Sequence, residues 1–316
     1  MIKEGKIVIV GAGMVGSAVL NALMSGSVVN EIAVIDMNED RVKGEVLDAS
    51  HTNAFSFSNN VNVHVGSYED CKDAQVIIIT AGPSITPDNA SSRMLLLNKN
   101  IAVMDSVMSE ITKYTKEAII IIVSNPLDIL VQYAQTHFDY PRHKLLGTGT
   151  LLDTARLRQM IGEKCGVDSK NVHGYVLGEH GENAFVTWSG VNVSGIPYDQ
   201  LNDVFQTDLD KQALYDNMRN VGLEMVKLKG YTSSGIAASC NRLLKCIMLN
   251  EQSVLPIASV QKSVYGLNEV AMSLPSIVGK QGIERVLEIP LSEKEKTFLN
   301  HCSEHISSIM NSIQQK

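Results

Sequence analysis

A glycine-rich turn near the N-terminus constrains the fold of this chain more than any other sequence feature. The sequence Gly11-Ala12-Gly13-Met14-Val15-Gly16 directly follows a β-branched run, residues 6–10, and opens an apolar segment of helical length, residues 15–24. Glycines at this spacing permit a tight turn and let a pyrophosphate group approach the backbone at the helix N-terminus, where the helix dipole favours negative charge. The pattern predicts a strand, a phosphate-binding turn and a helix.

Three more β-branched runs, at residues 32–35, 76–79 and 119–123, extend this pattern. They are apolar on both faces, as parallel strands buried between helices are. Residues 95–114 are predicted to form a helix between two of them, so we expect right-handed βαβ crossovers. We therefore expect an α/β fold in which residues 1–147 form a doubly wound parallel sheet that binds a dinucleotide.

A different pattern begins near residue 148. Helices are predicted at residues 153–162, 210–227 and 235–249, and apolar runs with the spacing of antiparallel strands at 172–176, 254–260 and 270–278. The last helix starts with a capping box, Ser292 and Glu295. Its apolar face comprises Phe298, Cys302, Ile306, Ile309 and Ile313. We expect residues 148–316 to form a second lobe of α+β type.

Composition and charge exclude several classes of protein. The formal net charge of −7 and the lack of a basic stripe argue against a nucleic-acid-binding surface. The sequence has neither the ~18 uninterrupted apolar residues of a membrane span nor a recognisable signal segment, so we expect a cytoplasmic protein. Five scattered cysteines without metal-ligand spacing are expected to be reduced, buried thiols, and no metal is expected: Cys71, Cys165, Cys240, Cys246 and Cys302.

An acid at the end of the second predicted strand indicates which dinucleotide binds. Asp36 lies twenty residues after Gly16, where a carboxylate can bind both hydroxyls of an adenosine ribose. The same carboxylate disfavours a 2'-phosphate. A glycine turn with an unrelated solvated aspartate is the alternative, but the strand, the spacing and the acid occur together. The sequence therefore predicts NAD in preference to NADP.

The chemistry of a small hydroxy acid dehydrogenase is indicated by Gly178-Glu179-His180-Gly181, Asp153-Thr154-Ala155-Arg156 and Arg93. A histidine held by a carboxylate can relay a hydroxyl proton near neutral pH. A planar guanidinium can bind a substrate carboxylate through two parallel hydrogen bonds, and a second arginine can polarise the carbonyl. We therefore predict His180, Asp153, Arg93 and Arg156 as the catalytic residues.

Each of these residues also has a purely structural interpretation. A lone histidine is usually structural or solvated, but His180 is accompanied by the other three groups. Asp153 could cap the helix that it begins. Arg156 could form an intrahelical salt bridge with Asp153. We expect Arg156 to be unpaired instead, because a site that binds a carboxylate needs a free cation.

The order of the motifs resembles that of the lactate/malate dehydrogenase family over essentially the whole chain. The matching elements are Gly11 to Gly16, Asp36, Ala81-Gly82, Arg93, Val123-Ser124-Asn125-Pro126, Asp153 to Arg156, Gly178 to Gly181 and Lys229-Gly230-Tyr231-Thr232. The resemblance implies a Rossmann domain followed by a catalytic domain and hydride transfer between NAD and pyruvate or lactate. It also implies a homotetramer, of the bacterial type because the chain begins without a long N-terminal arm.

The resemblance assigns a role to individual residues. His180 would exchange the proton, Asp153 would orient it, Arg156 would clamp the substrate carboxylate and Arg93 would close over the carbonyl. Asn125, Thr232, Ile85 and Ile236 would complete the substrate pocket. The dinucleotide groove would comprise Gly11, Gly13, Val15, Gly16, Asp36, Arg41, Tyr68, Gly82, Ser106, Val123 and Asn125.

The substrate loop departs from the family pattern. Its third residue after Ala81-Gly82 is Ile85, where lactate enzymes typically have Gln and malate enzymes Arg. Malate is disfavoured, because an apolar pocket would leave the second carboxylate of oxaloacetate unpaired at a cost of about several kcal/mol. The loop is also about two residues longer than usual, so a 2-hydroxyisocaproate-type dehydrogenase is an alternative. Lactate ranks first because Thr232 keeps the lactate pattern, and the complete catalytic set disfavours an NAD-binding sensor without activity.

Arg158 and His173 raise the prospect of regulation. Their positions match the pair that binds fructose 1,6-bisphosphate between subunits of allosteric bacterial members of the family. Two such pairs meeting at a twofold axis would form a cationic site for an anion. The alternative is that both residues are ordinary polar side chains on the surface, and the sequence does not decide between these two interpretations.

Overall fold

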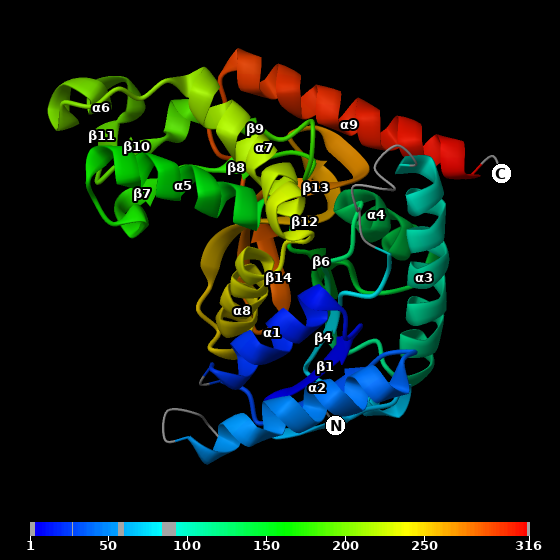
Figure 1. Cartoon of the computed structure of the whole chain (residues 1–316). Helices are drawn as coiled ribbons and strands as arrows, with labels where there is room; N and C mark the ends of the chain where they lie inside the picture. Colours follow the sequence, from blue (N-terminus) through cyan, green and yellow to red (C-terminus); the bar gives the residue numbers. More distant parts are fainter. Residues whose placement is uncertain (1–3, 27, 56–59, 84–92, 315–316) are drawn as a thin grey trace.

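A mixed sheet runs through the computed structural model, which describes residues 4–26, 28–55, 60–83 and 93–314 (Figure 1). Within these ranges nine strands pair in the order β14-β13-β12-β6-β5-β4-β1-β2-β3. Its parallel strands are β1 (Lys6–Val10), β2 (Glu31–Ile35), β3 (Asn62–Val65), β4 (Val76–Ile79), β5 (Ile119–Ile122) and β6 (Leu145–Gly147). The doubly wound parallel sheet predicted from the sequence is confirmed.

Helices cover both faces of this sheet. One face packs against α1 (Met14–Met24), α2 (Glu39–His51) and α8 (Ser234–Met248). The other packs against α3 (Arg93–Tyr114), α4 (Leu127–His137) and α9 (Glu293–Gln314). Successive residues of β1 are buried on opposite faces, Ile7 in the first core and Val8 in the second. This double burial explains why the strands are apolar throughout, since each buried aliphatic side chain contributes about 1.5–3 kcal/mol.

The second half of the chain extends the same sheet. The predicted antiparallel runs are β12 (Ser253–Val264) and β13 (Leu267–Gly279), with β14 (Gly282–Val286) at the edge. β12 joins the parallel part through an antiparallel pairing of Ala258 with Gly147. The strands that the sequence assigned to a second lobe therefore belong to the first sheet.

A smaller core lies at the other end of the molecule from α1 and α2 (Figure 1). It is formed by α5 (Leu151–Cys165), α6 (Tyr198–Phe205), α7 (Lys211–Lys229), β7 (Val172–His173), β8 (Val176–Leu177), β9 (Phe185–Val186), β10 (Asn192–Val193) and β11 (Ile196–Pro197). The run predicted as one strand, residues 172–176, is thus divided between β7 and β8, which lie in different sheets. Short one-turn helices complete the chain: η1 (Thr52–Ala54), η2 (Tyr68–Lys72), η3 (Arg142–Lys144), η4 (Ser169–Asn171) and η5 (Trp188–Gly190).

Helix α9 confirms its predicted start and corrects its predicted face. Glu295 accepts from the amide of Ser292 at 2.7 Å, and the Ser292 hydroxyl accepts from the amide of Glu295 at 3.4 Å. Phe298, predicted as core, is 44% exposed, whereas its neighbour Leu299 is buried. The other four predicted residues are confirmed, since Cys302 and Ile306 are buried and Ile309 and Ile313 pack against the core, whereas Phe298 stacks on Phe185. None of the described helices combines the length and apolar character needed to cross a membrane.

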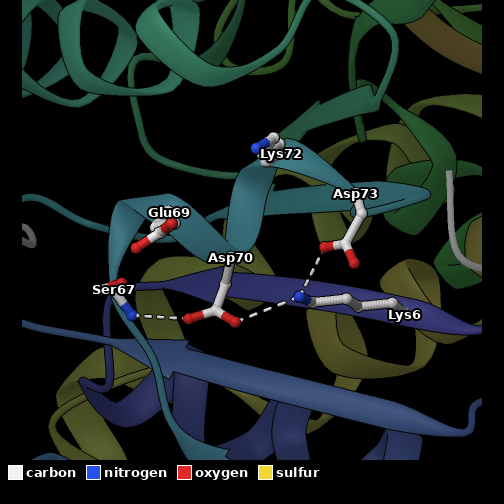
Figure 2. Close-up of a pocket in the computed structure, with 6 residues that line it drawn as sticks. All are labelled: Lys6, Ser67, Glu69, Asp70, Lys72 and Asp73. Atoms are coloured by element: carbon white, nitrogen blue, oxygen red, sulfur yellow. Dashed lines mark hydrogen bonds and ion pairs between the residues drawn. The ribbon is translucent and has the colours of Figure 1, made fainter. Parts of the chain in front are cut away.

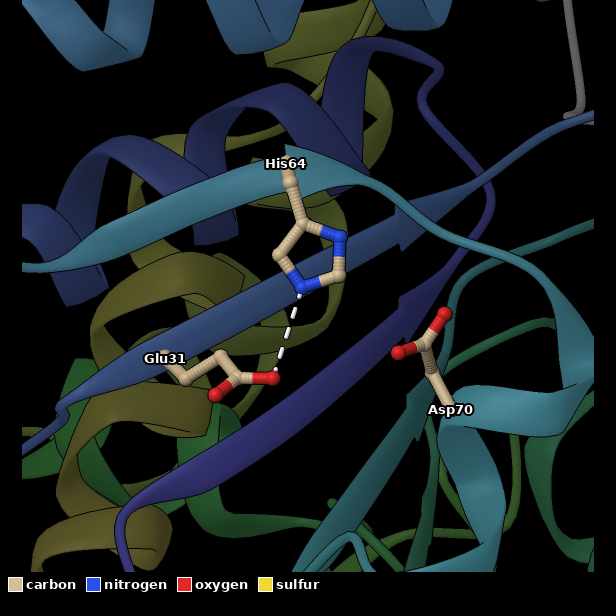
Figure 3. A group of neighbouring side chains, drawn as sticks. All are labelled: Glu31, His64 and Asp70. Carbon is tan, nitrogen blue, oxygen red and sulfur yellow. Dashed lines mark hydrogen bonds and ion pairs between the residues drawn. The ribbon is translucent and has the colours of Figure 1, made fainter.

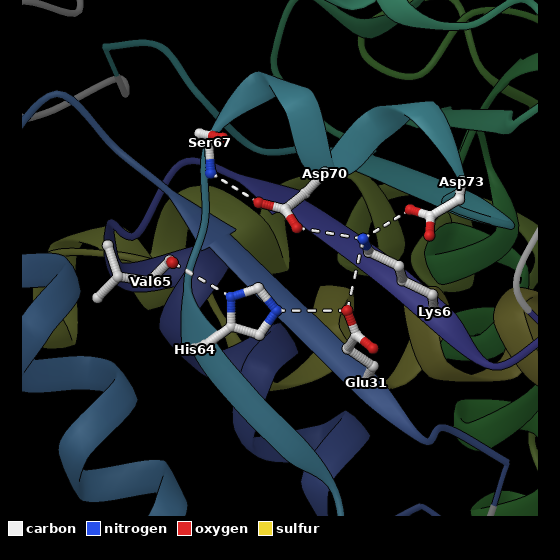
Figure 4. A network of polar contacts seen from close by, with 7 residues as sticks. All are labelled: Lys6, Glu31, His64, Val65, Ser67, Asp70 and Asp73. Carbon is white, nitrogen blue, oxygen red and sulfur yellow. Dashed lines mark hydrogen bonds and ion pairs between the residues drawn. The ribbon is translucent and has the colours of Figure 1, made fainter.

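A buried lysine ties the parallel strands to η2. The ammonium group of Lys6 lies 2.6 Å from Asp73, 3.1 Å from Asp70 and 3.4 Å from Glu31 (Figure 4). Burial alone would lower the pKa of Lys6, but the hydrogen bonds that the ammonium group donates to Asp73 and Asp70 outweigh it and raise the pKa above its ordinary value. Lys6, Asp70 and Asp73 also line a hollow of about 460 Å³, together with Ser67, Glu69 and Lys72 (Figure 2).

Glu31, His64 and Asp70 each place one ligand-type atom within 4.8 Å of the others (Figure 3). The ammonium group of Lys6 is in contact with both of these carboxylates. A cation already neutralises the acidic groups, so we interpret the cluster as an ion-pair network that holds β1, β2 and η2 together.

Replacing Lys6 with Met should lower the free energy of unfolding by about 3 kcal/mol, because breaking a buried ion pair leaves its carboxylates uncompensated. The matched control is Lys113→Met, which removes an exposed pair with Glu110 and should cost less than about 1 kcal/mol. Urea unfolding of both variants measures the difference. Equal losses for the two variants would show that the network does not stabilise the fold.

Candidate active site

The histidine motif lies in the loop between β8 and β9, which is fixed from two sides. Gly178 exchanges two backbone hydrogen bonds with Ser273 of β13, at 3.1 and 2.9 Å. It has a φ of +90°, and a Cβ there would lie 2.7 Å from the Sγ of Cys302 on α9. Only glycine meets both requirements without strain, so the motif's first residue sets the loop against the sheet and α9.

His180 is held by a carboxylate, as the sequence predicts. Its Nδ1 lies 2.7 Å from Oδ2 of Asp153, which is buried in the first turn of α5. The negative charge of Asp153 outweighs the effect of burial and raises the pKa of His180 to about 9. Burial alone would raise the pKa of Asp153, but the charge of His180 and that of Arg156 bring it below its usual value. The pair is therefore an imidazolium and a carboxylate at neutral pH.

The expectation that Arg156 is unpaired is wrong. Its Nη1 donates to Oδ1 of Asp153 at 3.0 Å. The two residues are three positions apart on α5 and share one face of the helix, and the buried carboxylate draws in a second cation. Within the described part of the chain this is the only hydrogen bond of the guanidinium, which leaves four of the five N–H donors of an arginine. Gly222 of α7 packs close to Nη2.

Asp128 is a member of the site that the sequence reasoning missed. Its Oδ2 accepts a hydrogen bond of 2.7 Å from the backbone amide of His180, and the residue is 1% exposed on the first turn of α4. Burial raises the pKa of Asp128 to about 7. A sequence signal exists, because Asp128 stands alone in the apolar run 127–131. Acids are almost never fully buried unless paired.

The glycine turn has the shape that a pyrophosphate group requires. A Cβ on Gly16 would overlap the carbonyl oxygen of Gly11, so the helix packs directly on the turn. A Cβ on Gly13, in contrast, would meet nothing within 4 Å. The open side of the turn therefore faces free space at the N-terminus of α1, as an anion site at a helix N-terminus does.

Asp36 is fixed beside this turn. It accepts from the amide of Ala12 at 2.7 Å and from the amide of Asn38 at 2.9 Å, one bond to each oxygen. A carboxylate has about four acceptor sites, so both oxygens can still bind hydroxyl groups.

An adjoining hollow of about 310 Å³ is lined by Ala12, Gly13, Met14, Ser17, Ala18, Asn21, Arg41, Glu45, Tyr231 and Ser233. Gly13 and Arg41 were predicted, whereas Tyr231 and Ser233, on either side of Thr232, bring the second half of the chain to the groove.

The remaining predicted residues are distributed around this edge of the sheet. Val123 directly follows β5 and is buried, and Asn125 and Ser106 are exposed. Ile236 lies in the first turn of α8 and packs on the core beside α1. Val15 packs on the same core, and Tyr68 packs on the opposite one; neither lines the hollow. Gly82 adjoins Asn100.

The substrate loop lies outside the described residues. Ile85 falls within this stretch, so its predicted place in the pocket is not addressed by the structure. Arg93 begins α3, but its side chain is also outside the described part. The predicted contact of Arg93 with a substrate carbonyl therefore stays a prediction.

The predicted effector residues are brought next to each other. Arg158 of α5 donates to the carbonyl oxygen of Gly174 through Nε at 3.3 Å and Nη2 at 3.0 Å. Its guanidinium lies 5.6 Å from the ring centre of Tyr175. His173 directly precedes Gly174 and is exposed. The guanidinium of Arg158 is thus held at the residue that follows His173.

Two family descriptions match the chain. The lactate/malate dehydrogenase NAD binding domain matches residues 5–147, and the lactate/malate dehydrogenase alpha/beta C-terminal domain matches residues 150–316. L-lactate dehydrogenase 2 of Clostridium acetobutylicum is 54% identical over 98% of both chains. The L-lactate dehydrogenase of Selenomonas ruminantium is 42% identical over 96% of both chains.

The chain is also similar to solved structures of lactate dehydrogenases. A minor L-lactate dehydrogenase from Enterococcus mundtii, solved in its ligands-bound form, superposes with a TM-score of 0.92 at 32% identity and covers 98% of each chain. A lactate dehydrogenase from a Medee basin deep-sea metagenome library superposes with a TM-score of 0.94 at 31% identity, over 99% of this chain and 100% of that one. The similarity therefore extends over both halves of the chain.

Replacing Gly13 with Val should weaken NADH binding by about tenfold or more, because the added side chain fills the space over the helix N-terminus without disturbing the fold. The matched control is Gly190→Val, since a Cβ on Gly190 likewise meets nothing within 4 Å but lies in η5. Fluorescence titration with NADH and a thermal melt measure both variants. Unchanged NADH affinity in the Gly13 variant would contradict the assignment of the groove.

Proposed function

We propose that the chain, which belongs to the lactate/malate dehydrogenase family, reduces pyruvate to L-lactate with NADH and uses His180 as the proton donor. The chain is an NAD-dependent L-2-hydroxy acid dehydrogenase, and relatives that it matches over nearly their whole length are L-lactate dehydrogenases. The observation that carries the proposed mechanism is the 2.7 Å contact between His180 and Asp153. It provides a charged imidazole whose second nitrogen, Nε2, has no hydrogen-bond partner among the described residues and can contact a substrate.

His180 acts as the general acid of the reduction. Because Nδ1 donates to Asp153, Nε2 is the nitrogen that gives its proton to the carbonyl oxygen of pyruvate. NADH, when bound, supplies the hydride that reduces the carbonyl carbon. Asp153 stabilises the imidazolium before transfer and holds the ring in place after it. In the reverse direction neutral His180 takes the hydroxyl proton of lactate.

Arg156 binds the carboxylate of the substrate. One of its nitrogens is engaged by Asp153, which fixes the plane of the guanidinium, and the remaining donors can form two parallel hydrogen bonds to a carboxylate. The contact with Asp153 thus orients Arg156 without consuming its charge. Arg93 polarises the substrate carbonyl, and Asn125, Thr232 and Ile236 line the pocket; these roles follow from the family resemblance.

The groove between the glycine turn and Asp36 would hold NAD. The open side of Gly13 accommodates the pyrophosphate, and the Asp36 carboxylate, held by Ala12 and Asn38, binds the ribose hydroxyls. A 2'-phosphate at the same place would meet this negative charge, which favours NAD over NADP. The hollow between Gly13, Arg41 and Tyr231 supports a cofactor that contacts both halves of the chain.

A homotetramer regulated by fructose 1,6-bisphosphate is the second part of the proposal. Arg158 and His173 lie next to each other at the end of β7, and the carbonyl of Gly174 anchors the arginine. Two such pairs across a twofold axis would supply two guanidinium groups and two imidazoles for a doubly phosphorylated sugar. We place this assembly in the cytoplasm.

NADH oxidation with pyruvate, 2-oxoisocaproate and oxaloacetate tests the activity, each with and without fructose 1,6-bisphosphate. We expect pyruvate to give the highest kcat/KM, and His180→Asn to lower it by about 10³-fold while NADH affinity is kept. The control is His301→Asn, at an exposed position of α9.

Three outcomes would change the proposal. Preference for 2-oxoisocaproate would assign the chain to bulkier 2-oxo acids. Full activity of the His180 variant would exclude the mechanism. A bisphosphate that changes neither the KM for pyruvate nor the melting temperature would exclude the effector site.

A further inference from the structure

Asp128 is a buried carboxylate at a position where a neutral side chain could also hold the His180 loop. It is 1% exposed, and its Oδ1 has no hydrogen-bond partner among the described residues. Its Oδ2 accepts a hydrogen bond of 2.7 Å from the amide of His180. An asparagine or serine could accept the same bond without the penalty of burying a carboxylate. The negative charge itself therefore needs an explanation.

The surroundings of Asp128 connect it to the reacting group. α4 follows directly after Asn125 and Pro126, and Leu127 and Ile129 on either side of Asp128 are buried in the core. The carboxylate is thus held on a rigid helix start and reaches the loop that carries His180. Gly178 is fixed to β13 and the imidazole to α5, so Asp128 supplies the third anchor of the loop.

We propose that Asp128 is a positioning residue of the reaction, which holds the backbone of His180 and places a second negative charge beside the imidazole that Asp153 orients. This inference rests on the proposed function of His180. The start of α4 then has two roles. Asp128 holds the backbone of His180, and Asn125, which directly precedes Pro126, lies at the substrate as we propose. Movement of α4 would then displace Asn125 and His180 together.

The charged groups around His180 determine in which direction the pKa of His180 changes when the charge of Asp128 is removed. Asp153 raises the pKa of His180 most strongly and Asp128 raises it further, whereas Arg156 lowers it. Glu179, on the same loop, opposes ionisation of Asp128 and pairs with His305 of α9 at 2.9 Å. Removal of the Asp128 charge therefore lowers the pKa of His180. The protonated form required for reduction is then lost at a lower pH.

Asp128→Asn tests the charge, because it keeps an oxygen acceptor and the shape of the side chain. We expect kcat/KM for pyruvate to match the wild type near about pH 6 and to be lower by about tenfold above about pH 9, because the variant loses the protonated imidazole at a lower pH. The Cε1 resonance of His180, followed by NMR in labelled protein, should titrate at a correspondingly lower pH. This second readout does not depend on turnover.

Asp128→Ala tests the anchor, because it removes the acceptor as well. We expect an additional fall of kcat by about tenfold at every pH, since His180 is no longer held in the reacting geometry. NADH affinity should stay within about twofold in both variants, because neither the glycine turn nor Asp36 is changed. The matched control is Asp105→Asn, which removes the charge of a carboxylate bonded to Tyr133 and should leave the pH profile unchanged.

The proposal is overturned if the Asn variant keeps the wild-type pH profile and the wild-type titration of His180. It is also overturned if the Asn and Ala variants lose activity equally at every pH in step with their melting temperatures, which would indicate a structural role alone. Failure of the proposed function has a different signature. In that case the wild type itself oxidises no NADH with any 2-oxo acid, while the NMR titration still decides the role of Asp128.

Discussion

The structure of the site depends on one contact, the hydrogen-bonded ion pair of Asp153 and His180. Asp153 is buried on α5, so its charge requires positive partners, and His180 and Arg156 supply them. In return the carboxylate fixes the imidazole, keeps it protonated at neutral pH and turns the guanidinium toward the same space. A single buried acid thereby aligns the two groups that we propose as proton donor and carboxylate-binding group.

The fold explains why this pair lies beside a dinucleotide groove. β6 ends at Gly147, and α5 begins at Leu151, so the sheet delivers Asp153 directly after its last parallel strand. The glycine turn lies at the end of β1 in the same sheet. Residues from the second half of the chain also lie at this edge, where Tyr231 and Ser233 line the same hollow as Gly13. The continuous sheet thus holds the proposed cofactor groove and the proposed proton donor in fixed positions relative to each other.

Much of this arrangement could be predicted from local sequence patterns. Parallel strands buried on both faces are apolar throughout, and the turn, Asp36 and the His180 motif have characteristic spacings. The joining of β12 to β6 could not be predicted, because antiparallel runs carry no information about which edge they meet. Arg156 was misjudged for a related reason: a spacing of three residues permits a salt bridge, but only the burial of Asp153 favours it.

The partners of buried polar residues could not be predicted from the sequence either. Lys6 lies within an apolar strand and Asp128 within an apolar helix start, and neither has a local partner. Their partners are distant in the chain, at Asp70, Asp73 and His180. Such pairs become visible only when the tertiary structure brings the two charges or donors together.

The pH dependence of both directions of the reaction tests the central claim most directly. If Asp153 holds His180 protonated up to a pKa of about 9, kcat/KM for pyruvate should stay constant below that pH and fall above it. For lactate, kcat/KM should rise toward the same pH and then level off, because oxidation needs the neutral imidazole. Breaks near about 6.5, the ordinary pKa of histidine, in both profiles would show that the ion pair does not control the proton and would contradict the account.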